Sequence, residues 1–314
     1  MVPSAKWIEG LSSESTVEEA ARRSLEPRLA AVVHLLPLAA YLASHDIEHV
    51  HRLRVATRRA GATLKLYWDC LSPNSARWMK KRLRKIRRAA GDARDLDVLA
   101  DRLARDYGEP VAPVIELIAN DRAAVQPAIV RVADRCRHGD LLVRKAAKLL
   151  HTIPVPNALG HGTQPALFRD WAAAQFAKVA SEFAAAMPNE SADTVALHQF
   201  RIRGKALRYA IELVSPVFGP ELRKELYPVV EKLQERLGRV QDHVAAIERC
   251  KHWAADARGE SIQETLRELS AAEERGLANA TREFRSWWTD ERMSQVGALL
   301  APSCSQVLHG NEEE

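Results

Sequence analysis

The chain has 314 residues, and its 46 Lys and Arg against 41 Asp and Glu give a formal net charge of +5. A composition of 46% hydrophobic and 28% charged residues is typical of a globular protein and excludes an intrinsically disordered one. The longest stretch without charge, residues 29–44, is shorter than the roughly 20 residues that a membrane-spanning helix needs. We therefore expect a buried helix there and no membrane partner.

Cysteine usage and the first residues bear on the cellular compartment. Residues 1–6 lack the apolar core of a secretion signal. The cysteines are far apart and form no CxxC pair, so they indicate neither a disulfide framework nor a zinc site. Free thiols suit a reducing environment, and we expect a cytoplasmic protein. The four cysteines are Cys70, Cys136, Cys250 and Cys304.

The expected elements are helices throughout. Hydrophobic residues recur with a period close to 3.6 along nearly the whole chain, and no segment alternates as a half-buried strand would. Glycine and proline account for only 29 residues, fewer than an average chain of this length contains. We predict an all-α protein whose helices are interrupted near residues 72–74, 108–110, 139, 188–189 and 218–220.

One segment, residues 151–165, has the composition of a linker, with three prolines and two glycines. It divides the chain into halves of similar length. The predicted organisation is a flexible N-terminus (1–14), a first helical-bundle repeat (15–150), the linker (151–165), a second helical-bundle repeat (166–300) and a flexible acidic tail (301–314).

The two halves share motifs at one offset, which indicates an internal duplication. A His-x-x-Arg motif and a later Gly-x-x-x-Asp motif each recur 147 residues further on. We expect four main helices in each half: an apolar helix, a His-containing helix, a helix that ends at the glycine, and one more. Short connections then favour two antiparallel four-helix bundles. The matching residues are His51, Arg54, Gly91 and Asp95 in the first half, and His198, Arg201, Gly238 and Asp242 in the second.

The positive charge is concentrated in residues 51–88, where thirteen Lys and Arg stand against one acid. This segment carries +12, and the rest of the chain sums to −7. A local basic surface of this kind indicates a polyanionic partner.

On a helical wheel these cations form stripes beside the apolar face of each His-containing helix and along the next helix. Two acids, Glu231 and Glu235, dilute the second half's version of that next helix. The candidate anion-binding residues are His51, Arg54, Arg58, Lys65, Arg77, Lys81, Arg84, Lys85 and Arg88 in the first half, and His198, Arg201, Lys205, Arg208 and Lys232 in the second.

Two repeated residue types leave alternatives open. His51 and His198 either bind the anion or make structural hydrogen bonds between the halves. Asp95 and Asp242 either cap a helix or orient a buried arginine. A metal role for the acids of the first half is weaker, because Asp92 and Asp97 have no counterpart 147 residues later.

These motifs resemble the CHAD family, the conserved-histidine α-helical domain. The family's His-x-x-Arg-[Val/Ile] helix is matched at residues 51–59 and again at 198–209, and residues 91–98 resemble its Gly-x-x-Arg-Asp-x-Asp-Val signature. The similarity extends over about residues 15–300. This chain departs from the pattern at Gly61, where family members often carry another arginine.

The resemblance implies two four-helix bundles related by pseudo-twofold symmetry. It also implies a basic surface and central pore that bind inorganic polyphosphate, and association with polyphosphate granules. Polyphosphate is a flexible polyanion without bases, so it calls for repeated cations and no stacking aromatic rings. Arginine would grip phosphate oxygens with its planar fork, and lysine would act as a mobile point charge.

Three other functions compete with polyphosphate binding. The basic segment would bind DNA or RNA non-specifically. A metal-dependent phosphohydrolase acting on polyphosphate would need further ligands beyond His45 and Asp46, and no GxSxG, P-loop or HExxH motif occurs. An adaptor for another protein is the third alternative, although no motif names a protein partner. We therefore expect no catalysis, no metal and no cofactor.

Overall fold

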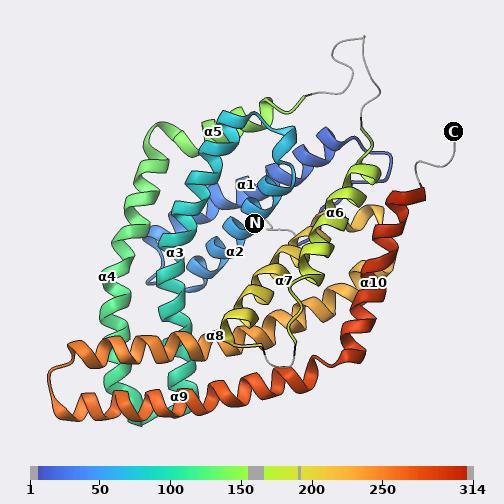
Figure 1. The fold of residues 1–314 in the computed structure, drawn as a ribbon. Helices are drawn as coiled ribbons and strands as arrows, with labels where there is room; N and C mark the ends of the chain where they lie inside the picture. Colours follow the sequence, from blue (N-terminus) through green and yellow to red (C-terminus); the bar gives the residue numbers. More distant parts are fainter. Residues whose placement is uncertain (1–5, 155–165, 190–191, 310–314) are drawn as a thin grey trace.

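The computed structural model describes residues 6–154, 166–189 and 192–309, with side chains up to residue 301. Its first half holds α1 (Val17–Tyr41), α2 (Glu48–Leu66), α3 (Pro73–Tyr107), α4 (Ala112–Arg137) and α5 (Leu141–His151). Its second half holds α6 (Phe168–Ala184), α7 (Thr194–Val214), α8 (Tyr227–Asp256), α9 (Glu260–Trp287) and α10 (Asp290–His309). The all-α prediction is confirmed (Figure 1).

Shorter helical turns lie at the breaks between these helices. The 3-10 turns are Trp68–Cys70, Glu109–Val111, His138–Asp140 and Ser215–Val217, and a π-helix, Leu222–Leu226, leads directly into α8. The breaks predicted near 108–110, 139, 188–189 and 218–220 fall between the main helices, and the break near 72–74 covers the start of α3. Clusters of Gly, Pro and polar residues therefore indicated where the main helices are interrupted.

Local sequence explains where the key helices begin and end. Thr16 caps α1, accepting a hydrogen bond from the Glu19 backbone N–H at 3.2 Å, and Asp193 caps α7 in the same way, with 2.8 Å to the Ala196 N–H. Pro73 occupies the first turn of α3, where its missing N–H costs nothing. At the other end of α3, Gly108 adopts a φ of +65°, which a glycine reaches without strain.

The helices of the two halves follow one another with nearly the same spacing. α2 begins at Glu48 and α7 at Thr194, and α4 begins at Ala112 and α9 at Glu260. These starts are separated by 146 and 148 residues, close to the motif offset of 147. Each half has four helices of 17 or more residues followed by a fifth. This spacing is what a duplication predicts.

The prediction that helices end at Gly91 and Gly238 is wrong. α3 continues through Gly91 to Tyr107, and α8 continues through Gly238 to Asp256. Neither glycine adopts the positive φ that ends a helix. A glycine inside a helix costs only about 1 kcal/mol relative to alanine. The buried apolar residues on both sides of each glycine offset that cost and keep the helix continuous.

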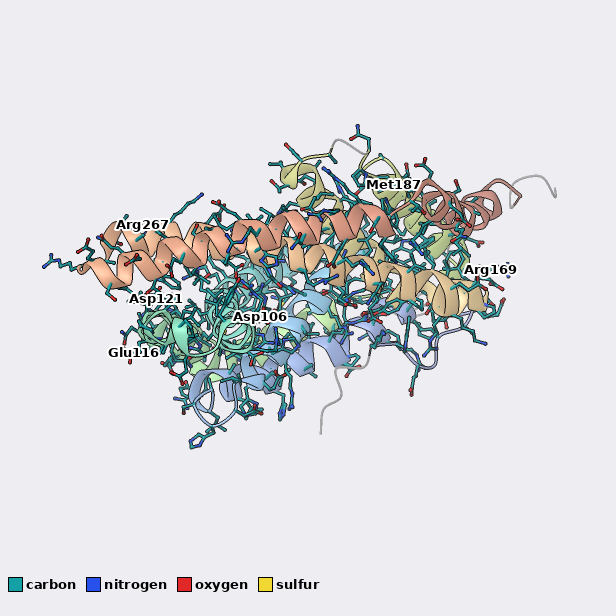
Figure 2. All side chains as sticks on the ribbon, turned by 90° about the horizontal axis from the view of Figure 1, so that it is seen from below. Asp106, Glu116, Asp121, Arg169, Met187 and Arg267 are labelled. Atoms are coloured by element: carbon teal, nitrogen blue, oxygen red, sulfur yellow. The ribbon has the colours of Figure 1, made fainter. Side chains whose placement is uncertain are left out.

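A single main core extends through both halves, and a second cluster joins them at one end. There the α8–α9 hairpin lies across the lower ends of α3 and α4 (Figure 1). Seen from below, the tip of α9 near Arg267 lies at the same end of the molecule as Asp121 of α4 (Figure 2). The second cluster includes Leu96, Leu103 and Val114 from the first half and Cys250, Trp253 and Leu266 from the second.

The boundaries predicted for the segments differ in places from the structure. Residues 6–14, which we expected to be part of a flexible N-terminus, lie against the second half: Ile8 is buried, and the Trp7 ring centroid is 5.0 Å from that of Tyr227. At the other end, α10 continues past residue 300 to His309. Residues 1–5, most of the linker (155–165) and residues 310–314 lie outside the described residues.

The uncharged stretch at 29–44 belongs mainly to α1, which buries Leu29, Val32 and Leu36 in the main core. This outcome confirms the expected buried helix. Within the described residues, no helix combines the length and the apolar character needed to cross a membrane.

Candidate functional site

The two His-containing helices, α2 and α7, pack against each other at the centre of the molecule. A cavity of about 830 Å³ lies between α2, α3 and α7, and we name it the α3 cavity. A second cavity of about 670 Å³ lies between α2, α3, α7 and α8, and we name it the α8 cavity. Arg54, Arg58 and Asp95 line both cavities, so the two adjoin at these side chains.

The α3 cavity is strongly cationic. Eight Lys and Arg line it against two acids, Asp92 and Asp95. Three of the eight cations come from α2, four from α3 and one from α7, so both halves of the chain contribute. The cations are Arg54, Arg58, Lys65, Lys80, Arg84, Arg87, Arg88 and Lys205.

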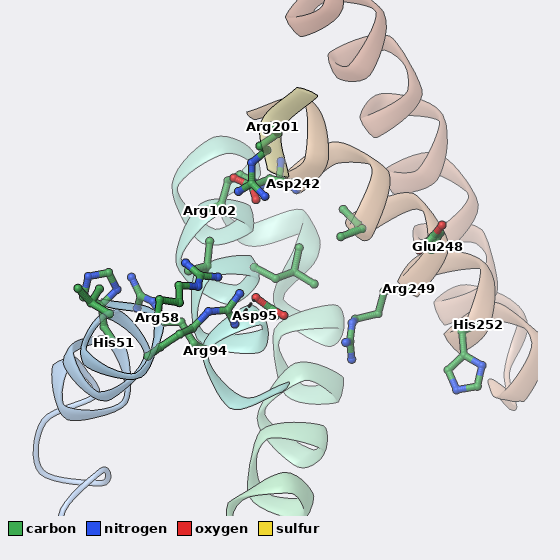
Figure 3. Close-up of a pocket in the computed structure, with 16 residues that line it drawn as sticks. His51, Arg58, Arg94, Asp95, Arg102, Arg201, Asp242, Glu248, Arg249 and His252 are labelled. Atoms are coloured by element: carbon green, nitrogen blue, oxygen red, sulfur yellow. Dashed lines mark ion pairs between the residues drawn. The ribbon is translucent and has the colours of Figure 1, made fainter. Parts of the chain in front are cut away.

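The α8 cavity has a mixed charge. Asp242 lies beside Arg102 and Arg201 at one wall of it, as Figure 3 shows. The carboxylates that line the α8 cavity offset part of its positive charge, so it attracts anions more weakly than the α3 cavity does. The charged and titratable residues that line it are His51, Arg54, Arg58, Arg94, Asp95, Arg102, Arg201, Asp242, Glu248, Arg249 and His252.

Asp95 orients an arginine. Arg54 Nη1 lies 2.8 Å from Asp95 Oδ1 and donates to the Gly91 carbonyl oxygen at 2.8 Å. These contacts join α2 to α3 and fix the guanidinium at the point where the cavities meet. Of the two alternatives for Asp95, helix capping and arginine orientation, the structure supports orientation, because α3 is unbroken there.

The second half repeats this arrangement more loosely. Gly238 lies near Arg201, since an added Cβ there would be 3.9 Å from Arg201 Nη2. Burial raises the pKa of Asp242, and the positive charge of Arg201 opposes that shift. In addition, the Gln234 side-chain amide donates to the Arg201 carbonyl oxygen at 3.0 Å. The guanidinium of Arg54 is thus fixed by the next helix of its half, whereas the next helix holds Arg201 through its backbone carbonyl.

Several cations at the meeting point are half-buried and mutually repulsive. Burial and, after it, the charge of Arg54 together lower the pKa of Arg58 to about 10. Burial, followed by the charges of Arg201 and Arg58, lowers the pKa of Lys205 to about 7. Cations whose charged form is disfavoured in this way would gain most from a bound anion.

The two histidines differ in their surroundings. His51 lines the α8 cavity, and burial, followed by the charge of Arg94, lowers its pKa. His198 lines neither cavity, and its Nδ1 is hydrogen-bonded to Gln241 Oε1. His198 therefore makes a hydrogen bond to the next helix of its own half, and not the expected one between the halves. His51 faces the cavity, where an anion could reach it.

The structure brings only some of the predicted site residues together. Arg54, Arg58, Lys65, Arg84, Arg88 and Lys205 line the α3 cavity, and His51 and Arg201 line the α8 cavity. The exposed Arg77, Lys81 and Lys85 line neither cavity, and neither do His198, Arg208 and Lys232.

Two of these residues have partners of their own. Arg208 lies over the Tyr209 ring, with its guanidinium carbon 5.2 Å from the centroid. Lys232 pairs with Glu235 at 2.9 Å, which is the acid that we expected to dilute this wall.

Sequence reasoning missed four other cavity cations, all of them on α3. Lys80 and Arg87 line the α3 cavity, and Arg94 and Arg102 line the α8 cavity. A signal existed, because residues 80, 84, 87, 91 and 94 follow the 3- and 4-residue spacing of a single helix face. The predicted stripe began at Arg77 instead. It followed a neighbouring face of α3, which points partly away from the α3 cavity.

Aromatic rings also line the α3 cavity, which differs from the expected absence of aromatics in the stripes. Trp68 and Tyr209 both line it. Lys80 Nζ lies 5.0 Å from the Trp68 ring centroid, a cation–π distance. Trp68 follows α2 and Tyr209 lies within α7, so the tertiary arrangement brings both rings to the cations of α3.

The acids that follow Gly91 are engaged by arginines. Asp95 pairs with Arg54, and Asp97 accepts from Arg122 Nε at 2.7 Å. In the described part of the chain, no group of three or more His, Cys, Asp or Glu side chains is arranged to hold a metal ion.

Comparisons with known proteins give the family. Four chains among the solved structures match, including a CHAD domain from the plant Ricinus communis and PptA from Streptomyces chartreusis. The first is 21% identical with a TM-score of 0.69, covering 95% of this chain and 96% of that one. The second is 18% identical with a TM-score of 0.58, covering 87% and 99%.

At these identities, the solved structures bear on the fold alone. No curated protein matches the sequence. The CHAD domain family, however, matches over residues 23–251, which is most of the chain. The protein therefore belongs to the CHAD domain family.

Proposed function

We propose that the protein binds inorganic polyphosphate in the α3 cavity, without cleaving it, and associates with polyphosphate granules in the cytoplasm. The observation that carries this proposal is the lining of the α3 cavity, where eight cations face two acids. Two of these cations, Arg58 and Lys205, are half-buried, and their charged forms are disfavoured until an anion arrives. The His-x-x-Arg motifs that imply polyphosphate supply Arg54 and Arg58 to this cavity.

The shape of the site suits a thin, flexible chain. The cations come from three helices around a cavity, so a ligand must enter between them rather than lie on a flat surface. A polyphosphate chain has no bulky groups and exposes oxygens along its whole length. It can therefore satisfy many arginine forks in succession. Exposed Arg77, Lys81 and Lys85 then extend the positive potential along α3 outside the cavity.

The test is a pair of matched double variants, titrated with a long polyphosphate at several salt concentrations. Arg54→Ala with Arg58→Ala removes two cavity cations, whereas Arg77→Ala with Lys81→Ala removes two cations outside it. We expect the cavity variant to bind at least about tenfold more weakly, with the salt slope reduced by about 2. The outer variant should retain most of the affinity. Equal effects of the two variants would show that the cavity is not the site.

Nucleic acid is the second candidate ligand, and Trp68 and Tyr209 favour it, because single-stranded nucleic acids use aromatic rings for base stacking. Competition of single-stranded DNA against polyphosphate at matched phosphate concentration separates the two. We expect polyphosphate to displace the DNA. A Trp68→Leu variant that loses DNA binding and keeps polyphosphate binding would assign the ring to the weaker, non-specific ligand.

The absence of catalysis is tested separately. We expect no release of phosphate from polyphosphate in the presence of Mg²⁺ or Mn²⁺. Release that is lost in the Arg54→Ala, Arg58→Ala variant would contradict this part of the proposal and favour the phosphohydrolase alternative.

A further inference from the structure

Lys205 of α7 has surroundings that set it apart from a surface lysine. It is half-buried, yet it lines the α3 cavity, so small solutes can reach it. The charges that act most strongly on its ammonium group are those of Arg201, Arg58, Arg54 and Arg208, and no carboxylate is among them. Burial and these arginines lower the pKa of Lys205 to about 7.

The rest of the cavity lining does not neutralise this environment. Lys205 forms no ion pair with a carboxylate among the described residues. The other charged and titratable side chains that line the cavity are Lys65 on α2, Lys80, Arg84, Arg87, Arg88, Asp92 and Asp95 on α3, and Tyr209 on α7.

These properties make Lys205 a nucleophile within an anion-binding cavity. A lysine amine attacks electrophiles only in its neutral form, and burial among other cations is a recognised way to produce that form. At pH 7 an ordinary lysine is neutral in about 1 molecule in 2,500. The neighbouring arginines, meanwhile, attract and bind phosphate groups. A small molecule that carries both a phosphate and an electrophilic carbon would therefore be held beside a reactive amine.

We propose that Lys205 is an acylation site that reacts with small acyl phosphates. The Nζ lone pair attacks the carbonyl carbon, so that a C–N bond forms and the C–O bond to the phosphate breaks. The phosphate leaves with the electrons of that bond and takes up the proton lost by the nitrogen. The products are an N-acyl lysine and inorganic phosphate, and the step needs no oxidant or reductant. Arg54 and Arg58, which line the same cavity as Lys205, are placed to stabilise the charge of the departing phosphate.

Acylation of Lys205 would regulate the anion site. It removes a positive charge next to Arg54 and Arg58 and adds a neutral acyl group to the cavity lining. Conversely, bound polyphosphate would cover the amine and favour its protonated form. This regulatory consequence rests on the proposed function, whereas the acylation itself rests only on the surroundings of Lys205.

The experiment treats the full chain with acetyl phosphate and follows acetylation at each lysine by mass spectrometry, at pH 7.0 and 8.5. Lys81, exposed and outside both cavities, is the internal reference. We expect Lys205 to react at least about tenfold faster than Lys81 at pH 7.0, because its neutral fraction is far larger. This ratio should narrow at pH 8.5, because the neutral fraction of Lys205 can rise by only about twofold from pH 7.0, whereas that of an ordinary lysine rises by about thirtyfold. Equal rates at pH 7.0 would overturn the proposal.

Two controls test phosphate capture and the reactivity of the Lys205 amine separately. N-hydroxysuccinimidyl acetate acylates amines but carries no phosphate. A preference for Lys205 that is as large with this reagent as with acetyl phosphate would overturn the role of phosphate capture. The Lys205→Arg variant keeps a positive charge and removes the amine, so acetylation at this position should vanish while the rate at Lys81 stays unchanged.

Polyphosphate added before acetyl phosphate distinguishes this inference from the proposed function. It should protect Lys205 and leave the rate at Lys81 unchanged. If polyphosphate fails to bind while Lys205 still reacts quickly, the proposed function fails and the acylation site stands. If polyphosphate binds but Lys205 reacts no faster than Lys81, the acylation site fails and the proposed function stands.

Discussion

An excess of Lys and Arg over carboxylates defines the site at the scale of single residues. In the free protein, Arg58 of α2 and Lys205 of α7 line the same cavity, and burial lowers the pKa of both. An anion stabilises the charged forms, so binding and protonation are linked. Because the pKa of Lys205 in the free protein is about 7, its effect on the pH dependence of binding lies near neutral pH, where binding can be measured.

We expect polyphosphate affinity to fall as the pH rises from 5.5 to 8. The free pKa of Lys205 is about 7, and the complex raises it, so binding takes up a proton between these two values. One such proton weakens binding by at most about tenfold per pH unit. Burial lowers the pKa of His51, so its contribution belongs to the acidic end of the range. The measurement is a titration at constant ionic strength.

The Lys205→Arg variant assigns this dependence. Arginine stays charged across the range, so the variant should bind polyphosphate with a flatter pH profile above pH 7. An unchanged slope in the variant would exclude Lys205 as the titrating group. If the polyphosphate affinity of the native protein does not change with pH, binding is not linked to protonation.

Gly61 offers a way to strengthen the site. It lines the α3 cavity, and an added Cβ would meet no atom within 4 Å. We expect Gly61→Arg to tighten polyphosphate binding several-fold and to steepen the salt slope by about 1, since it adds one cation to the lining. Gly61→Ala is the matched control and should leave binding unchanged. Tighter binding of both variants would attribute the gain to helix stability rather than to charge.

At the scale of whole helices, the contact between α7 and α8 sets the position of the second half's cations. Gly204 of α7 lies so close to α8 that an added Cβ would collide with the Gln234 side-chain amide and lie 3.0 Å from Leu233 Cδ2. Gln234 cannot move freely, because it donates to the Arg201 carbonyl oxygen. Leu233 is fully buried.

We therefore expect Gly204→Ala to lower the free energy of unfolding by about 1–3 kcal/mol, as overpacking does. The same substitution at Gly61 should instead raise it by up to about 1 kcal/mol, because alanine is the better helix former and the space is open. Urea unfolding of both variants checks the pair. A stabilised Gly204→Ala would mean that the two helices separate easily.

A sequence pattern predicts where helices lie, but it does not predict the effect of a glycine inside one. The 3.6-residue period predicted the helices, and the breaks at residues 108–110 and 139 fell where expected. Gly91 did not end its helix, because the effect of a glycine depends on the contacts around it. Likewise the pattern indicated Arg54 and Arg58, which line the α3 cavity, but on α3 it followed a face that points partly away from this cavity. The position of the cavity also depends on α7, which the pattern of α3 alone does not reveal.

At the scale of the whole molecule, two buried carboxylates bind the halves together, and neither was predicted. Glu212 accepts from Arg59 Nε at 2.9 Å and from the Tyr227 hydroxyl at 3.0 Å, which joins α2 to α7 and α8. Glu273 of α9 accepts from both terminal nitrogens of Arg102 on α3, at 2.8 and 2.9 Å. The partners are 15 to 171 residues apart in sequence, so no local motif marks them.

Glu273 has the strongest set of donors. The hydroxyl of Tyr107 donates to it at 2.9 Å, and His243 Nδ1 lies 2.7 Å away. Burial favours a raised pKa, but hydrogen bonds from His243 and Arg102 outweigh it and lower the pKa of Glu273 to about 2. The carboxylate is fully buried, so the molecule depends on these donors to keep it charged.

The sign of the resulting pH dependence follows from this shift. An unfolded glutamate has a pKa of about 4.3, so the unfolded chain binds more protons than the folded one between that value and the folded pKa. The contribution of Glu273 to stability is therefore complete above about pH 4.3 and is lost as the pH falls towards 2. At pH 7, Glu273→Gln should lower the free energy of unfolding by about 3 kcal/mol, because Arg102 is left without its carboxylate. Asp101→Asn, at an exposed acid 3.8 Å from Arg105, should change it by less than about 1 kcal/mol.

Urea unfolding at pH 7 and at pH 3 tests both expectations. The difference between native protein and Glu273→Gln should shrink at pH 3, since the native carboxyl is by then partly protonated in the unfolded chain, and the advantage of a low folded pKa diminishes. A difference that stays constant across this range would mean that Glu273 acts by packing alone. In that case the junction of α3, α8 and α9 would not depend on charge. The α8 cavity, which Arg102 also lines, would then keep its shape in acid.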